Sequence, residues 1–257
     1  MTSVFLSADF LEGKAQDEPG TTSLPWGPPA GFEYAQQFCE ENIYKLINRF
    51  ILMGASIDDD MHVVFISSLG KATPIWYQRA SLSKSPSASL SQSPSSAGSD
   101  AVWWDYHVIL QFGADIFDLD TLLPFPTPIA EYVELAFQPQ MTLEANNAQR
   151  FRVIKAGDYL QRFSSDRSHM AEALASGQCV AMPAWEAIRG CEALSDNEIE
   201  AFWDVSVLSV LTAPSEEGGS RGGLGGAGGA GDYLGVVLDR DAFFAWADGK
   251  CDDMDDE

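Results

Sequence analysis

The sequence contains few basic residues. Lys and Arg number 15 among 257 residues, against 38 Asp and Glu, so the formal net charge is −23 at neutral pH. The phosphates of nucleic acids and of anionic membranes would repel a surface of this sign. We therefore expect neither a nucleic acid nor a membrane as a partner. An acidic surplus of this kind is typical of a solvated surface.

Cysteine is also scarce, and the apolar runs are short. Cys39, Cys179, Cys191 and Cys251 show no C-x-x-C spacing, so neither a structural zinc site nor a disulfide framework is indicated. No apolar run reaches the roughly 18 residues of a membrane helix, and the acidic N-terminal stretch does not resemble a signal peptide. We expect a monomer without bound metal, in a reducing compartment such as the cytoplasm or the nucleus.

Regions of biased composition divide the chain. Residues 1–30 are rich in Pro, Gly, Asp and Glu and are expected to form a mobile leader. The Ser/Pro-rich stretch 80–100 and the Gly-rich stretch 214–231 cannot bury apolar side chains, so we interpret both as inserts in loops. The rest of residues 31–250 is apolar enough to form one folded domain, and residues 251–257 form an acidic tail.

Hydrophobic spacing predicts the order of helices and strands. CEENIYKLINRFIL (39–52) has helical periodicity, and its two glutamates suit the positive end of a helix dipole. Hairpins are predicted at 62–69 with 73–78 and at 102–112 with 116–123, and strand–helix pairs at 151–163 and 233–247. A helix, mostly antiparallel strands and late helices together predict an α+β fold with helices packed against an antiparallel sheet.

Cys39 stands directly at the start of the predicted first helix. Free backbone N–H groups and the helix dipole favour a thiolate there, and the same amides could face an oxyanion. Glu40 and Glu41 act in the opposite direction, because nearby negative charge disfavours a thiolate. The alternative is that Cys39 is a small buried residue that begins a helix.

His107 lies in the strand-like stretch AVWWDYHVIL (101–110). Along a strand, Trp103, Asp105, His107 and Ile109 would share one face. A histidine in this place is either a nucleophile's base or a core histidine that is satisfied by a hydrogen bond. The following hairpin bears on this choice.

Two aspartates follow the turn of that hairpin. If the loop is the two residues 113–114, His107 faces Asp120 and Asp118 is a diagonal neighbour on the same face, whereas a three-residue loop turns both away. A carboxylate beside an imidazole fixes its tautomer and stabilises its protonated form, as triad chemistry requires. The geometry of a hairpin does not decide between the two aspartates.

The other two histidines are weaker candidates. His62 follows a run of three aspartates and is expected to lie in a solvated loop. His169 follows a polar stretch in which Asp166 and Arg167 could form a structural ion pair.

Six segments resemble, in order, the motifs of one family, the protein N-terminal glutamine amidohydrolases, whose signature is W-D-Y-H-V. They are FCEENIYKL (38–46), VFISS (64–68), PIW (74–76), VWWDYHVIL (102–110), FDLDTLLPFP (117–126) and FRVIKAGDYLQRFSSDRSHM (151–170). The resemblance covers residues 33–170 and returns in the closing stretch 233–247. The stretch 171–213 matches poorly.

The resemblance implies a papain-like or transglutaminase-like cysteine amidase with an α-β-α sandwich fold. It implies that Cys39 is the nucleophile, that His107 is the base and that Asp118, rather than Asp120, orients the histidine. The implied reaction converts the N-terminal glutamine of proteins or peptides into glutamate and releases ammonia, without a cofactor. In the family, this step feeds the branch of the N-degron pathway that arginylates acidic N-termini.

Specificity for a free N-terminus implies a group that binds the substrate α-ammonium. Glu40, Asp105 and Asp166 are candidates by charge and position. Two other functions remain open. One is a different Cys-His-Asp acyl-transfer enzyme, such as a transglutaminase or a cysteine protease. The other is a non-catalytic module that binds N-termini.

Overall fold

The computed structural model describes residues 31–84, 100–177, 179, 181–209 and 234–252. The predicted leader, the Gly-rich insert, most of the Ser/Pro-rich insert and the end of the acidic tail lie outside these residues. The 3-10 helix η1 (Arg79–Lys84) shows that regular structure continues into the first residues of the predicted Ser/Pro-rich insert.

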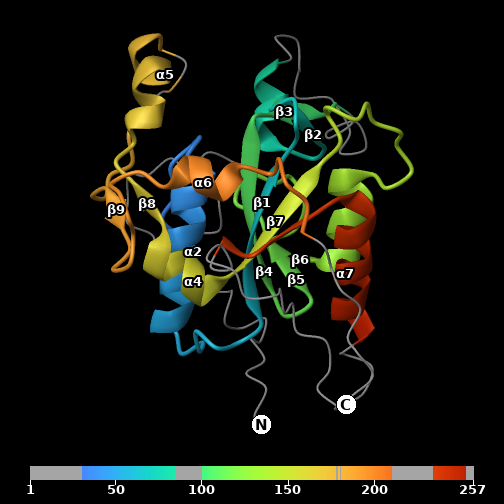
Figure 1. Cartoon of the computed structure of the whole chain (residues 1–257), viewed down its shortest axis with the longest axis horizontal. Helices are drawn as coiled ribbons and strands as arrows, with labels where there is room; N and C mark the ends of the chain where they lie inside the picture. Colours follow the sequence, from blue (N-terminus) through green and yellow to red (C-terminus); the bar gives the residue numbers. More distant parts are fainter. Residues whose placement is uncertain (1–30, 85–99, 178, 180, 210–233, 253–257) are drawn as a thin grey trace, which may run out of the picture.

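A six-stranded antiparallel sheet forms the centre of the molecule (Figure 1). In spatial order its strands are β10 (Val236–Leu238), β7 (Arg150–Lys155), β1 (Met61–Ser67), β4 (Tyr106–Phe112), β5 (Asp115–Phe117) and β6 (Thr127–Pro128). Strand β1 pairs with β4 on one side and with β7 on the other, and all of its residues are buried. A strand that is buried on both faces reads as a continuous apolar run, as β1 does.

Helices cover both faces of this sheet (Figure 1). One face carries α2 (Cys39–Leu52), α4 (Ala156–Arg162) and α6 (Ile199–Trp203), and the other carries α3 (Ile129–Tyr132), the π-helix η3 (Val133–Phe137) and α7 (Arg240–Asp252). Each face has its own cluster of buried apolar side chains. The predicted α+β class with an antiparallel sheet is therefore confirmed.

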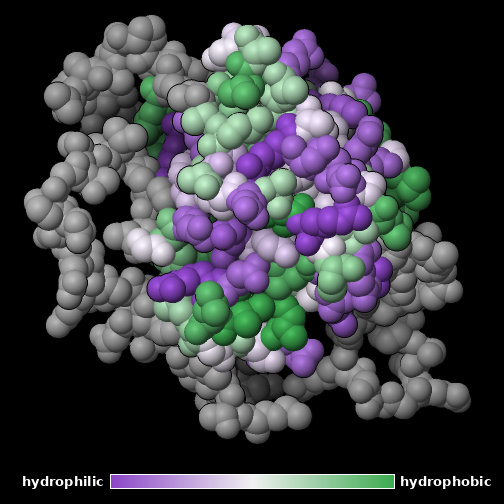
Figure 2. All heavy atoms as spheres, turned by 90° about the vertical axis from the view of Figure 1, so that its left-hand side faces the viewer, coloured by the Kyte–Doolittle hydropathy of each residue, from purple (hydrophilic) through white to green (hydrophobic). Residues whose placement is uncertain are grey.

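Smaller elements surround the three layers. They are the strand pairs β2 (Thr73–Ile75) with β3 (Val102–Trp104) and β8 (Ser164–Ser165) with β9 (Ile188–Arg189), the 3-10 helix η4 (Ser168–Met170) and α5 (Ala171–Ala175). Figure 2 shows the face on the α2 side, where hydrophilic residues cross the middle and hydrophobic residues gather towards the lower part. In the described part of the chain, no helix is long and apolar enough to cross a membrane.

The predicted hairpin between residues 62–69 and 73–78 is wrong. Strand β1 finds both of its partners, β4 and β7, far along the chain, and β2 pairs with β3 outside the main sheet. The segment that was expected to form one strand from 102 to 112 is divided at Asp105 into β3 and β4. The first helix and both late strand–helix pairs are confirmed.

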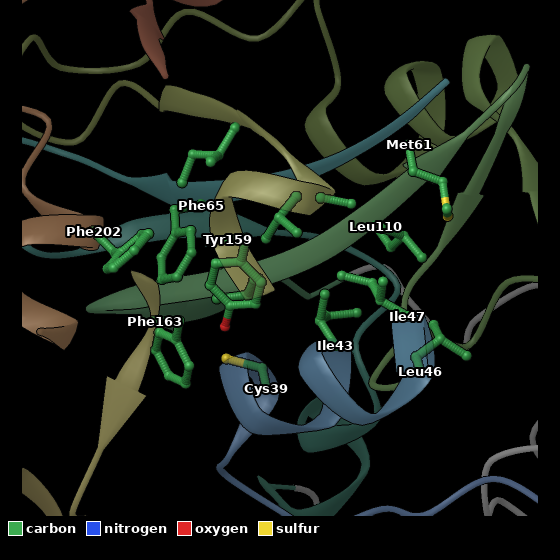
Figure 3. Packing of buried hydrophobic residues seen from close by; sticks show 14 of the residues in the cluster. Cys39, Ile43, Leu46, Ile47, Met61, Phe65, Leu110, Tyr159, Phe163 and Phe202 are labelled. Atoms are coloured by element: carbon green, nitrogen blue, oxygen red, sulfur yellow. The ribbon is translucent and has the colours of Figure 1, made fainter. Parts of the chain in front are cut away.

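The apolar spacing of α2 explains how this helix is fixed. Ile43, Leu46, Ile47 and Phe50 recur at helical intervals and are all almost completely buried. Figure 3 shows the first three of them on the side of α2 that faces the sheet, with Cys39 at the start of the helix. Burial of each side chain of this size contributes about 1.5–3 kcal/mol, so the apolar stripe determines which way the first turn points.

We expect Phe50→Ala to lower the free energy of unfolding by about 3–5 kcal/mol, because it leaves a cavity beneath the helix. Leu52→Ala is the control: this side chain is 81% exposed, and its loss should change stability by no more than about 0.5 kcal/mol. Urea unfolding followed by circular dichroism measures both. Equal effects of the two substitutions would contradict this account of the packing.

Candidate active site

The chain enters α2 in a fixed conformation. The side-chain amide of Asn42 donates to the carbonyl of Ala35, and its oxygen accepts from the backbone N–H of Ala35, both at 2.8 Å. The N-cap residue Phe38 offers no side-chain cap for the helix. The two hydrogen bonds of Asn42 instead hold the preceding loop against the first turn. Cys39 thereby becomes the first residue of the helix.

The thiol of Cys39 is buried between the helix and the sheet (Figure 3). Its Sγ donates to Oε2 of Glu40 at 3.5 Å. Burial raises the pKa of the thiol well above its usual range, and the charges of Glu40 and Asp120 raise it further, although the backbone N–H of Val108 acts in the opposite direction. Cys39 is therefore a thiol in this state, and it lies beside the residue that follows His107.

His107 is completely buried near the start of β4. Its Nε2 lies 2.9 Å from Oδ1 of Asp118, and the ring of Trp104 stacks on the imidazole with 5.0 Å between centroids. Burial lowers the pKa of His107, but the charge of Asp118 and its hydrogen bond raise it by more, so the net shift is upward. Among the described residues, Nδ1 has no hydrogen-bond partner, which leaves this nitrogen available to exchange a proton.

Asp118 is held by four hydrogen bonds. Oδ1 accepts from the ring of His107 and from the backbone N–H of Asp120, and Oδ2 accepts from Nε2 of Gln78 at 2.9 Å and from the hydroxyl of Tyr132 at 2.7 Å. Burial raises the pKa of Asp118, but the charge of His107 and the hydrogen bonds lower it by more. The carboxylate is thus ionised and fixed in position.

The hairpin geometry explains why Asp118, and not Asp120, reaches His107. The loop has two residues, because Phe112 pairs with Asp115, and the ladder continues only to the pair of Leu110 with Phe117. Beyond that pair the two strands no longer pair. Asp120, which would face His107 if the ladder continued, therefore does not bond to it, and Asp118 does. Asp120 instead accepts from the hydroxyl of Tyr34 at 2.5 Å, and burial raises its pKa.

Both glutamates of the first turn are buried. Glu41 forms a bidentate pair with the guanidinium of Arg167, at 2.9 and 2.8 Å, and also accepts from Nε1 of Trp185. Arg167 therefore pairs with Glu41. The ion pair of Arg167 with Asp166 that the sequence suggested is not formed. Burial raises the pKa of Glu40 to about 8, from an ordinary value of 4.5.

The remaining sequence candidates are bonded to other groups. Asp105 is exposed and accepts from the backbone N–H of Tyr106, and Asp166 is exposed and accepts from the backbone N–H of Ser168. His62 is buried in β1, with Nδ1 2.7 Å from the side-chain oxygen of Gln111, so the predicted solvated loop is wrong.

Sequence reasoning did not find the side chains that support the site. Gln78 and Tyr132 come from distant segments that meet only in the folded chain, and no local pattern marks them. His107, Asp118 and Asp120 have potential ligand atoms within 4.8 Å of one another. The hydrogen bond between His107 and Asp118 already accounts for two of these three groups, and the absence of a metal stays a prediction.

Cys39 is buried at a helix N-terminus and is contacted by the backbone N–H of Val108. The residue before Val108 is His107, which is bonded to an ionised aspartate. These are the residue types that nucleophilic catalysis uses. A family model described as N-terminal glutamine amidase matches residues 34–220. The chain belongs to this family, as its motifs predicted.

Named relatives agree with this assignment. The protein N-terminal glutamine amidohydrolase of Bos taurus is 36% identical over 168 residues, which are 63% of this chain and 74% of the relative. The proteins of that name from Arabidopsis thaliana and Homo sapiens are 36% and 37% identical over 163 and 154 residues. These alignments span 60% and 58% of this chain, and 67% and 68% of the relatives.

The raised pKa of Glu40 predicts how stability depends on pH. Because the folded protein holds this proton more tightly than the unfolded chain, the stabilisation is fully present below pH 4.5 and is lost as the pH rises towards about 8. Between these values, the wild type should lose stability relative to Glu40→Gln. Urea titrations across this range measure the effect, with the exposed Glu131→Gln as the control. Parallel stability curves for wild type and Glu40→Gln would refute it.

Proposed function

We propose that this protein hydrolyses the side-chain amide of an N-terminal glutamine in proteins or peptides, leaving N-terminal glutamate and ammonia. The observation that carries the proposal is the contact of the buried Cys39, at the start of α2, with the backbone of Val108, the residue that follows the hydrogen-bonded His107. The names of the relatives supply the substrate class.

In the proposed mechanism, the Cys39 thiol leaves Glu40 and passes its proton to Nδ1 of His107. The thiolate attacks the side-chain amide carbon of the substrate, and the backbone N–H of Cys39 stabilises the resulting oxyanion. The imidazolium then protonates the amide nitrogen, so that the carbon–nitrogen bond breaks and ammonia leaves. A glutamyl thioester remains on Cys39.

Water completes the reaction. His107 takes a proton from a water molecule as its oxygen attacks the thioester carbon, and the carbon–sulfur bond breaks. The thiolate recovers the proton from His107, and glutamate is released. Asp118 stabilises the imidazolium in both steps, and its bonds to Gln78 and Tyr132 keep it in place. One water is consumed for each ammonia.

The proposal extends to the fold family, the pathway and the cellular location of the protein. The three layers, with the cysteine at a helix start and the histidine on a strand, support a papain-like or transglutaminase-like fold. New N-terminal glutamate would feed the arginylating branch of the N-degron pathway. We place the protein in the cytoplasm or nucleus as a monomer.

Substitutions in the proposed triad test this mechanism. Cys39→Ala and His107→Ala should reduce ammonia release from a Gln-initiated peptide to background, and Asp118→Asn should reduce it by about 10⁴-fold. Cys191→Ala is the control, because this cysteine is free and exposed. Thermal melting confirms that each variant is folded. Retention of activity in purified Cys39→Ala would exclude the nucleophile.

A peptide panel tests the substrate class. Initial glutamine should react, whereas acetylated initial glutamine and internal glutamine should not. Initial asparagine should react more slowly by at least about 10–200-fold, since its shorter side chain withdraws the amide from Cys39. Ammonia release is the measurement. Similar rates for initial and internal glutamine would indicate a general protein glutaminase, and transfer of the acyl group to an added amine would indicate a transglutaminase.

A further inference from the structure

The carboxylate of Glu40 is only partly satisfied. It is 0% exposed, and Oε2 accepts from the Cys39 thiol, but Oε1 has no hydrogen-bond partner in the part of the chain that the structure describes. A buried carboxylate oxygen without a hydrogen-bond donor costs free energy. Such an oxygen is expected where a ligand supplies the missing donor. Here it lies next to the nucleophile.

His169 faces the same oxygen. Its Nε2 lies 3.7 Å from Oε1 of Glu40, beyond hydrogen-bond distance, and neither of its ring nitrogens has a hydrogen-bond partner within the described ranges. The His169 side chain is 21% exposed, so it stands between the buried carboxylate and solvent. Oε1 of Glu40 and Nε2 of His169 thus face one another at the edge of the site without a hydrogen bond, and a ligand with N–H donors can bind to both.

We propose that Glu40 and His169 together bind the α-ammonium group of the substrate. This inference rests on the proposed function, and it names the residues that restrict the reaction to free N-termini. An ammonium has three N–H donors and no acceptor. The pKa of the Glu40 carboxyl is about 8 in the free protein, and the positive charge of a bound ammonium lowers it, so the carboxyl releases its proton to solvent as the ammonium binds. Oε1 of Glu40 then supplies a charged acceptor, and the unprotonated Nε2 of His169 supplies a second.

The dimensions of glutamine suit this arrangement. Its amide carbon is separated from the α-carbon by three carbon–carbon bonds of about 1.5 Å each, and the α-nitrogen is one bond further. Glu40 touches the attacking sulfur at 3.5 Å through its other oxygen. A substrate whose amide carbon lies against Sγ can therefore curl its α-nitrogen towards Oε1.

The protonation state of His169 supports its role as an acceptor. Burial lowers its pKa, and the charges of Glu41, Asp166 and Asp105 only partly oppose this. Together with Glu40, these are the acidic groups that act on the imidazole, and the guanidinium of Arg167 is paired with Glu41. A neutral ring keeps a lone pair for the ammonium, whereas a protonated ring would offer only donors and would repel it.

The neighbouring acids do not compete for this position. Both oxygens of Glu41 are bonded to Arg167, so this carboxylate is neutralised by a fixed cation. Asp105 and Asp166 are exposed and accept from backbone N–H groups. The hydroxyl of Tyr159 donates to the backbone carbonyl of Glu40 at 2.9 Å, which fixes the residue beside the thiol.

The test compares a Gln-initiated peptide with its Nα-acetylated form. Glu40→Gln should raise KM for the free peptide by about 10–100-fold, with a smaller change in kcat, and should narrow the rate ratio between the two peptides. His169→Leu should do the same. In the wild type, KM should rise at acid pH, because Glu40 and His169 both gain protons there. His169→Gln keeps an acceptor and cannot be protonated, so it should retain a low KM at neutral pH and show a smaller rise in KM at acid pH. The exposed Glu172→Gln is the control.

Binding is measured separately from turnover. In a Cys39→Ala background, calorimetry should detect the free peptide and not the acetylated one, and adding Glu40→Gln should abolish the difference. Absence of ammonia release by the wild type from any Gln-initiated peptide would defeat the proposed function itself. An active wild type whose peptide ratio is unchanged by Glu40→Gln and by His169→Leu would overturn the subsite alone. A loss of kcat on the free peptide without a rise in KM would also overturn it, by assigning Glu40 to the thiol.

Discussion

The packing of α2 against the central strands is the constraint on which the site depends. The apolar stripe of the helix places its first turn inside the protein, so Cys39, Glu40 and Glu41 are all buried. Burial of two adjacent carboxyl groups is costly unless each is neutralised or bonded. Arg167 neutralises one, and the raised pKa of Glu40 reflects the cost of the other. The chemistry of the first turn is thus a consequence of how the helix is docked.

The opposite wall is fixed by hydrogen bonds instead of apolar contacts. Asp118 receives donors from its own loop, from β4, from the segment after β2 and from α3. In a buried environment such a network is strong when every member is satisfied, and costly when one is removed. It keeps His107 in one orientation, with Nε2 engaged and Nδ1 unbonded in the described part of the molecule. Under the proposed function, this network would hold the general base on its strand, one residue before the backbone N–H that contacts Cys39.

Local patterns predicted the parts of this arrangement that depend on short stretches of chain. The spacing from Ile43 to Phe50 predicted α2, and the turn after Phe112 predicted a hairpin there. The length of that loop, and with it the register of β4 with β5, was left open by the sequence and is set by the pairing of Phe112 with Asp115. Pairing partners could not be read locally, because β1 joins segments that lie far apart in the sequence. The choice of Asp118 also required the motif resemblance, since the ladder ends at Phe117 before either aspartate.

Under the proposed function, charge would link substrate recognition to the reactivity of the thiol. Burial raises the pKa of Cys39, and the charges of Glu40 and Asp120 raise it further, so the free protein holds a protonated thiol. If the substrate ammonium binds at Glu40, its positive charge offsets the negative charge of this carboxylate, the nearer of the two. The ammonium also replaces the thiol as a donor to the Glu40 carboxylate. The pKa of the thiol should then fall when a free N-terminus is present. A peptide with a blocked N-terminus supplies no such charge, so it would be discriminated against in the chemical step as well as in binding.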